Sequence, residues 1–131
     1  NELAENVKSQ TKFAPLLGGN LSLIQSSIST PWEIRKSQPF CLLIEEVDEK
    51  AYAIDRTIRH LLNAGLFDNC QALFIGDISE NPGDDGKKHF SHVLEGLEKE
   101  LNIPIFSIPN IGHGKKNLSI PLGIPCLITK S

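Results

Sequence analysis

Short apolar runs alternate with longer amphipathic stretches along the chain, and this alternation predicts its secondary structure. Three runs rich in Leu, Ile and Phe are typical of strands buried on both faces of a sheet. They cover residues 40–44, 71–78 and 103–109. The run over residues 12–17 predicts a further short strand that leads into a turn at Gly18–Gly19. The proline-rich tail, residues 117–129, predicts a β-hairpin around Gly123.

The stretches between these runs carry apolar residues at helical spacing. The clearest stripe comprises Ile54, Ile58, Leu61 and Leu62. We expect Asp48 to cap the start of this helix and Gly65 to end it. Two further helices are predicted, one over residues 87–101 and a short one over residues 20–28 with Asn20 as its N-cap.

The order of these elements, in which strands alternate with helices, favours right-handed crossovers and a parallel central sheet. We therefore predict an α/β fold, and a chain of 131 residues suits a single domain of this kind. The N-terminal strand and the proline-rich tail are expected at the sheet edges or in a smaller antiparallel sheet, because proline cannot donate a ladder hydrogen bond.

Composition argues against several classes of function. The net charge of −3 leaves no basic excess for nucleic acid, and no apolar run approaches the roughly 20 residues of a membrane span. Three cysteines without a CxxC pair favour a reducing compartment and argue against a cysteine metal site. No signal peptide is recognisable, and a chain that opens without Met is expected to be a fragment or an excised domain.

Ionisable residues follow two of the predicted strands. Glu45 and Glu46 come directly after the run 40–44, and His113 lies between two glycines beyond the run 103–109. Because the carboxyl ends of parallel strands meet at one edge of a sheet, we expect a carboxylate and the imidazole to lie close together. A carboxylate bound to one ring nitrogen orients the ring and leaves the other nitrogen to accept a proton from a nucleophile.

Successive strand residues point to opposite faces, so only one of the two glutamates is expected to face the histidine. The alternative is that both carboxylates are solvated charges at a strand end and that the histidine is an ordinary loop residue. None of the serines lies in a GxSxG turn, so the sequence shows no recognisable nucleophile. The Glu–His pair is therefore either half of a catalytic relay or no relay at all.

Other polar groups give weaker signals. His89 and His92 have a spacing that a helical metal site allows, but no carboxylate or cysteine is clearly placed with them, so we expect no metal and no cofactor. The turn over residues 18–20 could bind an anion at a helix N-terminus or simply form a turn and a cap. Trp32, the only tryptophan, either lines a pocket or covers the edge of the core.

Three segments together resemble the C-terminal half of the LD-carboxypeptidase family, serine peptidases that remove the terminal D-alanine from cytoplasmic murein tetrapeptides. The segments are residues 16–34, 41–78 and 103–129. Their most specific parts are the GGNLS turn, the IEEVDE…IDR run and the C-terminal GHG…N…PLG motif. The combination covers nearly the whole chain from about Leu16, whereas any one motif alone would be weak. The microcin self-immunity peptidases belong to the same family.

The resemblance implies a swivelling β/β/α domain that contributes two residues to a Ser–Glu–His triad. By motif, the catalytic glutamate of the family falls on Glu45 and its histidine on His113, while Glu46 and Asp48 receive no catalytic role. The serine and the oxyanion hole would belong to an N-terminal domain that this chain does not contain. Alone, the chain is expected to fold but to be inactive.

The expected C-terminal domain covers residues 16–131, preceded by an interdomain linker or edge segment over residues 1–15. Asn20 and Trp32 are candidate substrate-binding residues. The implied partners are a murein tetrapeptide, the N-terminal serine domain and a second copy of the full-length protein in a cytoplasmic homodimer. Neither nucleic acid nor a membrane nor a cofactor is expected.

Two alternatives stay open at the level of the sequence. The chain could be half of a microcin-type immunity peptidase, or a non-enzymatic α/β interaction domain that needs no contact between Glu45 and His113. If an N-terminal domain normally covers the face with these residues, its absence is expected to expose Trp32, Ile111 and Leu17 as an apolar patch.

Overall fold

A computed structural model describes residues 12–80 and 86–128, and within them the chain forms one five-stranded sheet in the order β4-β3-β2-β1-β5. The strands are β1 (Lys12–Asn20), β2 (Phe40–Glu49), β3 (Cys70–Glu80), β4 (Ile105–Ser107) and β5 (Pro125–Ile128). The first four strands pair in parallel, and β5 pairs antiparallel with β1. The predicted α/β class with a parallel central sheet is confirmed.

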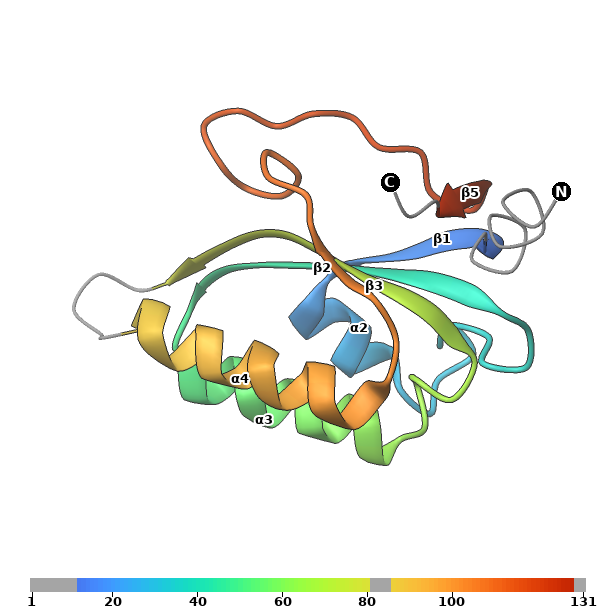
Figure 1. The fold of residues 1–131 in the computed structure, drawn as a ribbon, viewed down its shortest axis with the longest axis horizontal. Coiled ribbons are helices and arrows are strands. Elements are labelled where there is room, and N and C mark those ends of the chain that lie inside the picture. The colour runs from blue at the N-terminus through green and yellow to red at the C-terminus, as the bar shows by residue number, and fades with distance from the viewer. Residues whose placement is uncertain (1–11, 81–85, 129–131) are drawn as a thin grey trace, which may run out of the picture.

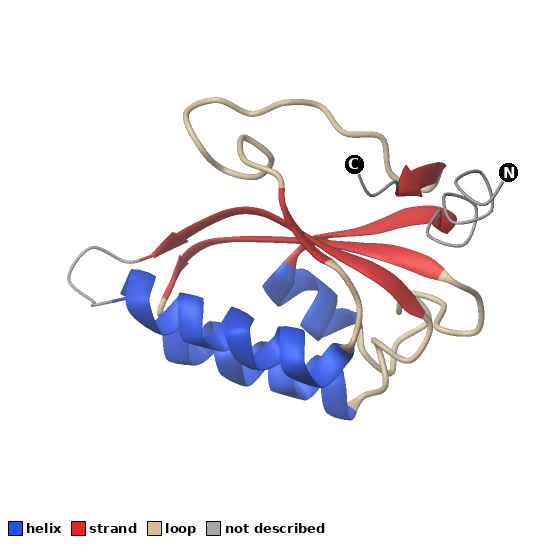
Figure 2. Cartoon of the chain, in the orientation of Figure 1, coloured by secondary structure: helices blue, strands red, loops and turns tan. Residues whose placement is uncertain are grey.

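The three helices of the described chain cover one face of the sheet, and an extended C-terminal segment covers the other (Figures 1 and 2). The helices are α2 (Leu21–Ser27), α3 (Ala51–Asn63) and α4 (Gly86–Leu101). Opposite them, the orange and red chain between β4 and β5 runs over the sheet without forming a helix or strand. The two faces of the sheet are therefore covered by different kinds of structure.

Alternate residues of β2 pack into two separate hydrophobic clusters. Leu42 and Ile44 contact the helix side, where the predicted stripe of α3 is buried against them. Cys41 and Leu43 face the other cluster, which the C-terminal segment covers. Both faces of β2 are therefore buried. Each buried Leu or Ile side chain contributes about 1.5–3 kcal/mol to stability relative to an exposed one. The continuous apolar run of β2 is explained by this double burial.

The expected turn at Gly18–Gly19 is wrong, because β1 continues through both glycines and pairs with β2 as far as Asn20. Gly18 has a φ of 127° and lies so close to β2 that an added Cβ would be 2.0 Å from the Leu43 carbonyl oxygen. Here glycine allows two backbones to approach each other rather than reverse the chain. Asn20 is the N-cap of α2 as predicted, since its Oδ1 accepts a hydrogen bond from the Leu23 N–H at 3.1 Å.

The predicted C-terminal hairpin is also wrong. Among the described residues of the tail, which end at 128, only β5 is a strand, and it pairs with β1 instead of with its own neighbouring residues. The Leu16 N–H donates to the Ile124 carbonyl oxygen, and the Gly123 N–H donates to the Leu16 carbonyl oxygen. These bonds to a strand more than 100 residues earlier in the chain replace the local pairing that a hairpin would provide. As a result β1 is an internal strand and not an edge.

Two smaller expectations also differ from the structure. The N-cap of α3 is Lys50, without a side-chain hydrogen bond, because Asp48 still lies in β2 with a φ of 57°. β4 is shorter than the predicted strand and spans three residues between Pro104 and Pro109, where the missing proline N–H groups limit the ladder. The predicted end of α3 is confirmed, since Gly65 follows the helix with a φ of 72°.

Candidate active site

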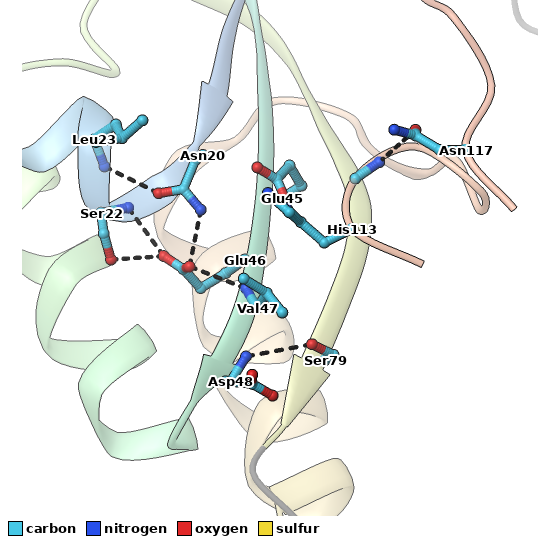
Figure 3. A network of polar contacts seen from close by, with 11 residues as sticks. Asn20, Ser22, Leu23, Glu45, Glu46, Val47, Asp48, Ser79, His113 and Asn117 are labelled. Atoms are coloured by element: carbon cyan, nitrogen blue, oxygen red, sulfur yellow. Dashed lines mark hydrogen bonds and ion pairs between the residues drawn. The ribbon is translucent and has the colours of Figure 1, made fainter. Parts of the chain in front are cut away.

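Glu45 and His113 meet beside the middle of β2, on the face covered by the C-terminal segment (Figure 3). The expectation that this strand ends at the two glutamates is wrong, because β2 continues to Glu49 and pairs with β3 there. The distance between His113 Nδ1 and Glu45 Oε2 is 2.7 Å. The Glu45 side chain is 9% exposed and that of His113 is 55% exposed. A buried carboxylate therefore holds one nitrogen of a ring that is otherwise open to solvent. The structure brings together the two residues that the sequence placed at one sheet edge.

Glycines make room for this contact. A Cβ on Gly76 of β3 would lie 2.4 Å from the Ile111 carbonyl oxygen, and a Cβ on Gly112 would lie 3.2 Å from Glu45 Oε2. Gly112 also has a φ of 139°, which L-residues rarely adopt. Any side chain at either position would move the loop that carries His113 away from β2.

Further hydrogen bonds close the loop around His113. On the β3 side, Asp77 accepts from the Asn110 N–H at 3.0 Å and donates its own N–H to the Ile111 carbonyl oxygen at 2.6 Å. On the far side, the Gly112 N–H donates to Asn117 Oδ1 at 3.2 Å. Sequence reasoning missed Asp77, because this residue lies inside the run 71–78, which as a whole predicts a buried strand.

Glu46 points to the opposite face and joins β2 to the start of α2 (Figure 3). Its Oε2 accepts from the Ser22 N–H at 2.9 Å and from the Ser22 hydroxyl at 2.7 Å. Its Oε1 accepts from Asn20 Nδ2 at 2.9 Å and from the Val47 N–H at 3.0 Å. Burial by itself raises the pKa of Glu46, but the bonds from Ser22, Val47 and Asn20 outweigh it and leave the pKa below its ordinary value.

The two candidate substrate-binding residues lie at different distances from the pair. Asn20 is the Cα partner of Glu45 across β1 and β2, but its side-chain amide bonds to Glu46 on the helix side of the sheet. Trp32 follows the far end of α2 and is 86% exposed. Seven residues of helix separate the two ends of α2, which is about 10 Å. The structure thus places the backbone of Asn20, but not Trp32, beside Glu45 in β2.

The three residues expected to form an apolar patch do not share one exposed surface in the structure. Leu17 packs against the helix-side cluster, whereas Ile111 packs against the cluster on the opposite face. Both side chains are partly buried, and only Trp32 of the three is an exposed large hydrophobic residue. The alternation of side chains along β1 explains why Leu17 and the loop residue cannot share one surface.

The described residues contain no group of three or more His, Cys, Asp or Glu side chains that could hold a metal ion. His92 is exposed on α4, and the side chain of His89 lies outside the described part of the structure. Within residues 12–80 and 86–128, no helix has both the length and the apolar character needed to cross a membrane.

Comparisons with known proteins were made for sequence and for structure. Residues 14–128 match the family model of the LD-carboxypeptidase C-terminal domain. A Rickettsia conorii protein named "Putative carboxypeptidase" is 33% identical over 116 residues, which cover 88% of this chain and 35% of that protein. The murein tetrapeptide carboxypeptidase of Pseudomonas aeruginosa is 26% identical over 112 residues, covering 82% of this chain and 35% of that protein.

A solved structure gives a similar result. The muramoyltetrapeptide carboxypeptidase from Oxalobacter formigenes superposes with a TM-score of 0.81 at 26% identity, covering 92% of this chain and 43% of that one. The chain thus spans about a third of the length of the curated relatives cited above.

Proposed function

This chain belongs to the LD-carboxypeptidase family, whose C-terminal domain it matches, and we propose that Glu45 and His113 are two members of a Ser–Glu–His triad. The reaction is hydrolysis of the bond to the terminal D-alanine of a murein tetrapeptide in the cytoplasm. The proposal rests on one observation, the 2.7 Å hydrogen bond between Glu45 Oε2 and His113 Nδ1.

The chemistry follows from the geometry of this bond. An ionised carboxylate can only accept hydrogen bonds, so the proton in the contact belongs to Nδ1 of His113. The other ring nitrogen, Nε2, then carries a lone pair and can take the proton of a serine hydroxyl as that oxygen attacks the peptide carbonyl. Glu45 keeps the ring in this tautomer and stabilises the imidazolium that forms.

The serine belongs to the part of the enzyme that precedes this domain. Within the described residues, no hydrogen bond joins a serine hydroxyl to His113, while the 55% exposed ring leaves space for one from outside. We therefore infer that the chain alone does not hydrolyse the peptide. The homodimer of the full-length protein stays a prediction.

The substrate is assigned from the relatives. The Pseudomonas aeruginosa and Oxalobacter formigenes proteins carry murein or muramoyl tetrapeptide in their names. Asn20 is the candidate polar contact to the peptide because β1 ends at this residue, with its backbone paired beside Glu45, although its amide bonds to Glu46 on the helix side. The non-enzymatic alternative requires no bond between Glu45 and His113, so it leaves this contact unexplained.

The proposal can be tested by joining the chain to the N-terminal part of the Oxalobacter formigenes enzyme and measuring D-alanine release from a murein tetrapeptide. We expect the joined protein to release D-alanine and the 131-residue chain to release none. His113→Ala should lower kcat by roughly 10⁴-fold, since triad residues contribute effects of this order. His92→Ala, which changes an exposed histidine on α4, is the matched control and should leave kcat unchanged.

Two outcomes count against the proposal. One is D-alanine release by the isolated chain, with contaminating peptidases removed. The other is a folded joined protein in which His113→Ala and His92→Ala have the same activity.

A further inference from the structure

Asp77 lies where β2 and β3 pair irregularly, opposite Glu45. The regular Cα partners on either side are Ile44↔Ile75 and Glu46↔Ile78. Between them β2 advances by two residues and β3 by three, so β3 carries one extra residue at this point. Such β-bulges redirect side chains and are common beside active sites. Here the bulge places Gly76 and Asp77 next to Glu45, and a Cβ on Gly76 would lie 3.2 Å from the Glu45 Cβ.

Asp77 holds the His113 loop through two hydrogen bonds. Its backbone N–H donates to the Ile111 carbonyl oxygen at 2.6 Å, which continues the contact between β3 and the chain beyond β4. Its carboxylate Oδ1 accepts from the Asn110 N–H at 3.0 Å. Asn110 has a φ of 65°, an uncommon conformation for a residue other than glycine, and the charged acceptor offsets the cost of this backbone geometry.

The Asp77 side chain also lies close to both glycines that flank His113. A Cβ on Gly114 would be 2.7 Å from Asp77 Oδ2, and a Cβ on Gly112 would be 3.3 Å from the Asp77 Cβ. The loop therefore rests on Asp77 on both sides of His113. With its two flanking residues fixed, the imidazole projects towards Glu45.

We propose that Asp77 is a positioning residue for His113, which fixes the loop 110–114 so that Nδ1 of the imidazole meets Glu45. It acts through the backbone of the loop and not by contact with substrate. The claim about loop geometry stands on this structure alone. Only its consequence for catalysis rests on the function proposed above.

Two variants of nearly identical shape separate the hydrogen bond from side-chain packing. Asp77→Asn keeps an oxygen acceptor for the Asn110 N–H, whereas Asp77→Leu has the same branching without an acceptor. Asp55→Ala, on the exposed side of α3, is the control for loss of an aspartate elsewhere. Asp77→Ala gives a second variant without an acceptor in case Leu prevents folding.

The first measurement uses the 131-residue chain and does not require activity. Amide hydrogen exchange by NMR should become at least 10-fold faster at Asn110 in Asp77→Leu and stay within about 3-fold of the parent chain in Asp77→Asn. Side-chain ¹⁵N shifts of neutral His113 should show the Nδ1–H tautomer in the parent chain and in Asp77→Asn, and a mixture of tautomers in Asp77→Leu. A general loss of stability would instead speed exchange throughout the sheet.

The second measurement is kinetic and uses the chain joined to the N-terminal part. Displacement of a catalytic group by about 1 Å can cost on the order of 100-fold in rate, so Asp77→Leu should lower kcat by 10- to 100-fold with little change in KM. Asp77→Asn should retain most of the kcat of the parent protein.

The positioning role is overturned if Asp77→Leu and Asp77→Ala leave both the Asn110 exchange rate and the His113 tautomer as they are in the parent chain. It is also overturned if Asp77→Asn disturbs both as strongly as Asp77→Leu does. An inactive joined protein, in contrast, would count against the proposed function alone, because the NMR result for Asp77 does not depend on turnover.

Discussion

Glu45 and Glu46 are neighbours in β2, and the two sides of the sheet give them opposite surroundings. Glu46 faces the helices and accepts four hydrogen bonds, from Asn20, Ser22 and Val47, so that its carboxylate is fully engaged in the fold. Glu45 faces the C-terminal segment. There its carboxylate is hydrogen-bonded to His113, whose side chain is about half exposed.

The difference shows how one residue type serves two purposes in adjacent positions. A carboxylate surrounded by donors from its own helix and strand stabilises the domain. A carboxylate whose partner is an imidazole open to solvent leaves that partner free to act on another molecule. Under the proposed function, the covering structure, and not the glutamate itself, determines which role each residue has.

The largest expected effect separates the two glutamates by activity. In the chain joined to its N-terminal part, Glu45→Gln should lower kcat by roughly 10⁴-fold, because the neutral amide no longer fixes the tautomer or stabilises the imidazolium. Glu46→Gln should stay within about 10-fold of the parent. D-alanine release, with folding verified by circular dichroism, measures both. Equal losses in the two variants would remove the distinction between them.

The next effect is on stability, and here we expect the change at Glu46 to be the important one. Glu46→Ala leaves donors from Asn20, Ser22 and Val47 without their acceptor and should lower the free energy of unfolding by about 2–4 kcal/mol. Urea denaturation of the isolated chain measures this change. Glu98→Ala, at an exposed site on α4, is the control and should stay within about 0.5 kcal/mol. A loss below 1 kcal/mol for Glu46→Ala would show that water satisfies these donors.

A smaller effect tests whether the contact between Glu45 and the loop that carries His113 depends on close packing. Gly112→Ala places a methyl group 3.2 Å from Glu45 Oε2 at a φ of 139° and should cost about 1–3 kcal/mol while lowering kcat at least 10-fold. Gly123, with a φ of 77°, has nothing within 4 Å of an added Cβ, so Gly123→Ala should cost about 1 kcal/mol with unchanged kcat. Thermal unfolding and D-alanine release distinguish the two. Similar kcat values would contradict the packing argument.

The smallest effect is a pH dependence that belongs to Glu46. Its pKa is lowered in the folded state from the ordinary value of 4.5, so the charged form stabilises the fold above that value. This contribution is lost as the pH falls from about 4.5 through the folded-state pKa. The difference in unfolding free energy between the parent chain and Glu46→Gln should therefore shrink between neutral pH and pH 3. A constant difference over this range would show that charge is not the source of the stabilisation.

Local patterns sufficed for most of the elements. The apolar stripe of α3 and the apolar run of β2 can each be recognised within one short segment. The cap at Asn20 likewise joins residues only three positions apart in the sequence. The pairing of Gly18 with β2 and of β5 with β1 could not be predicted in this way, because each depends on a partner distant in the chain. A glycine permits both a turn and a close approach of two strands, and only the neighbouring strand selects between them.

For the candidate site, the residue types and the place of the two glutamates directly after an apolar run are properties of the sequence, although β2 continues beyond them to Glu49. Alternation along a strand already requires Glu45 and Glu46 to face opposite sides. Which of them meets the histidine was decided by the tertiary structure. The three helices of the described residues pack on the Glu46 side, and the segment with His113 crosses the other face. The bond between residues 45 and 113 spans 68 positions, and it forms because the bulge in β3 and the bonds of Asp77 bring the loop down onto β2.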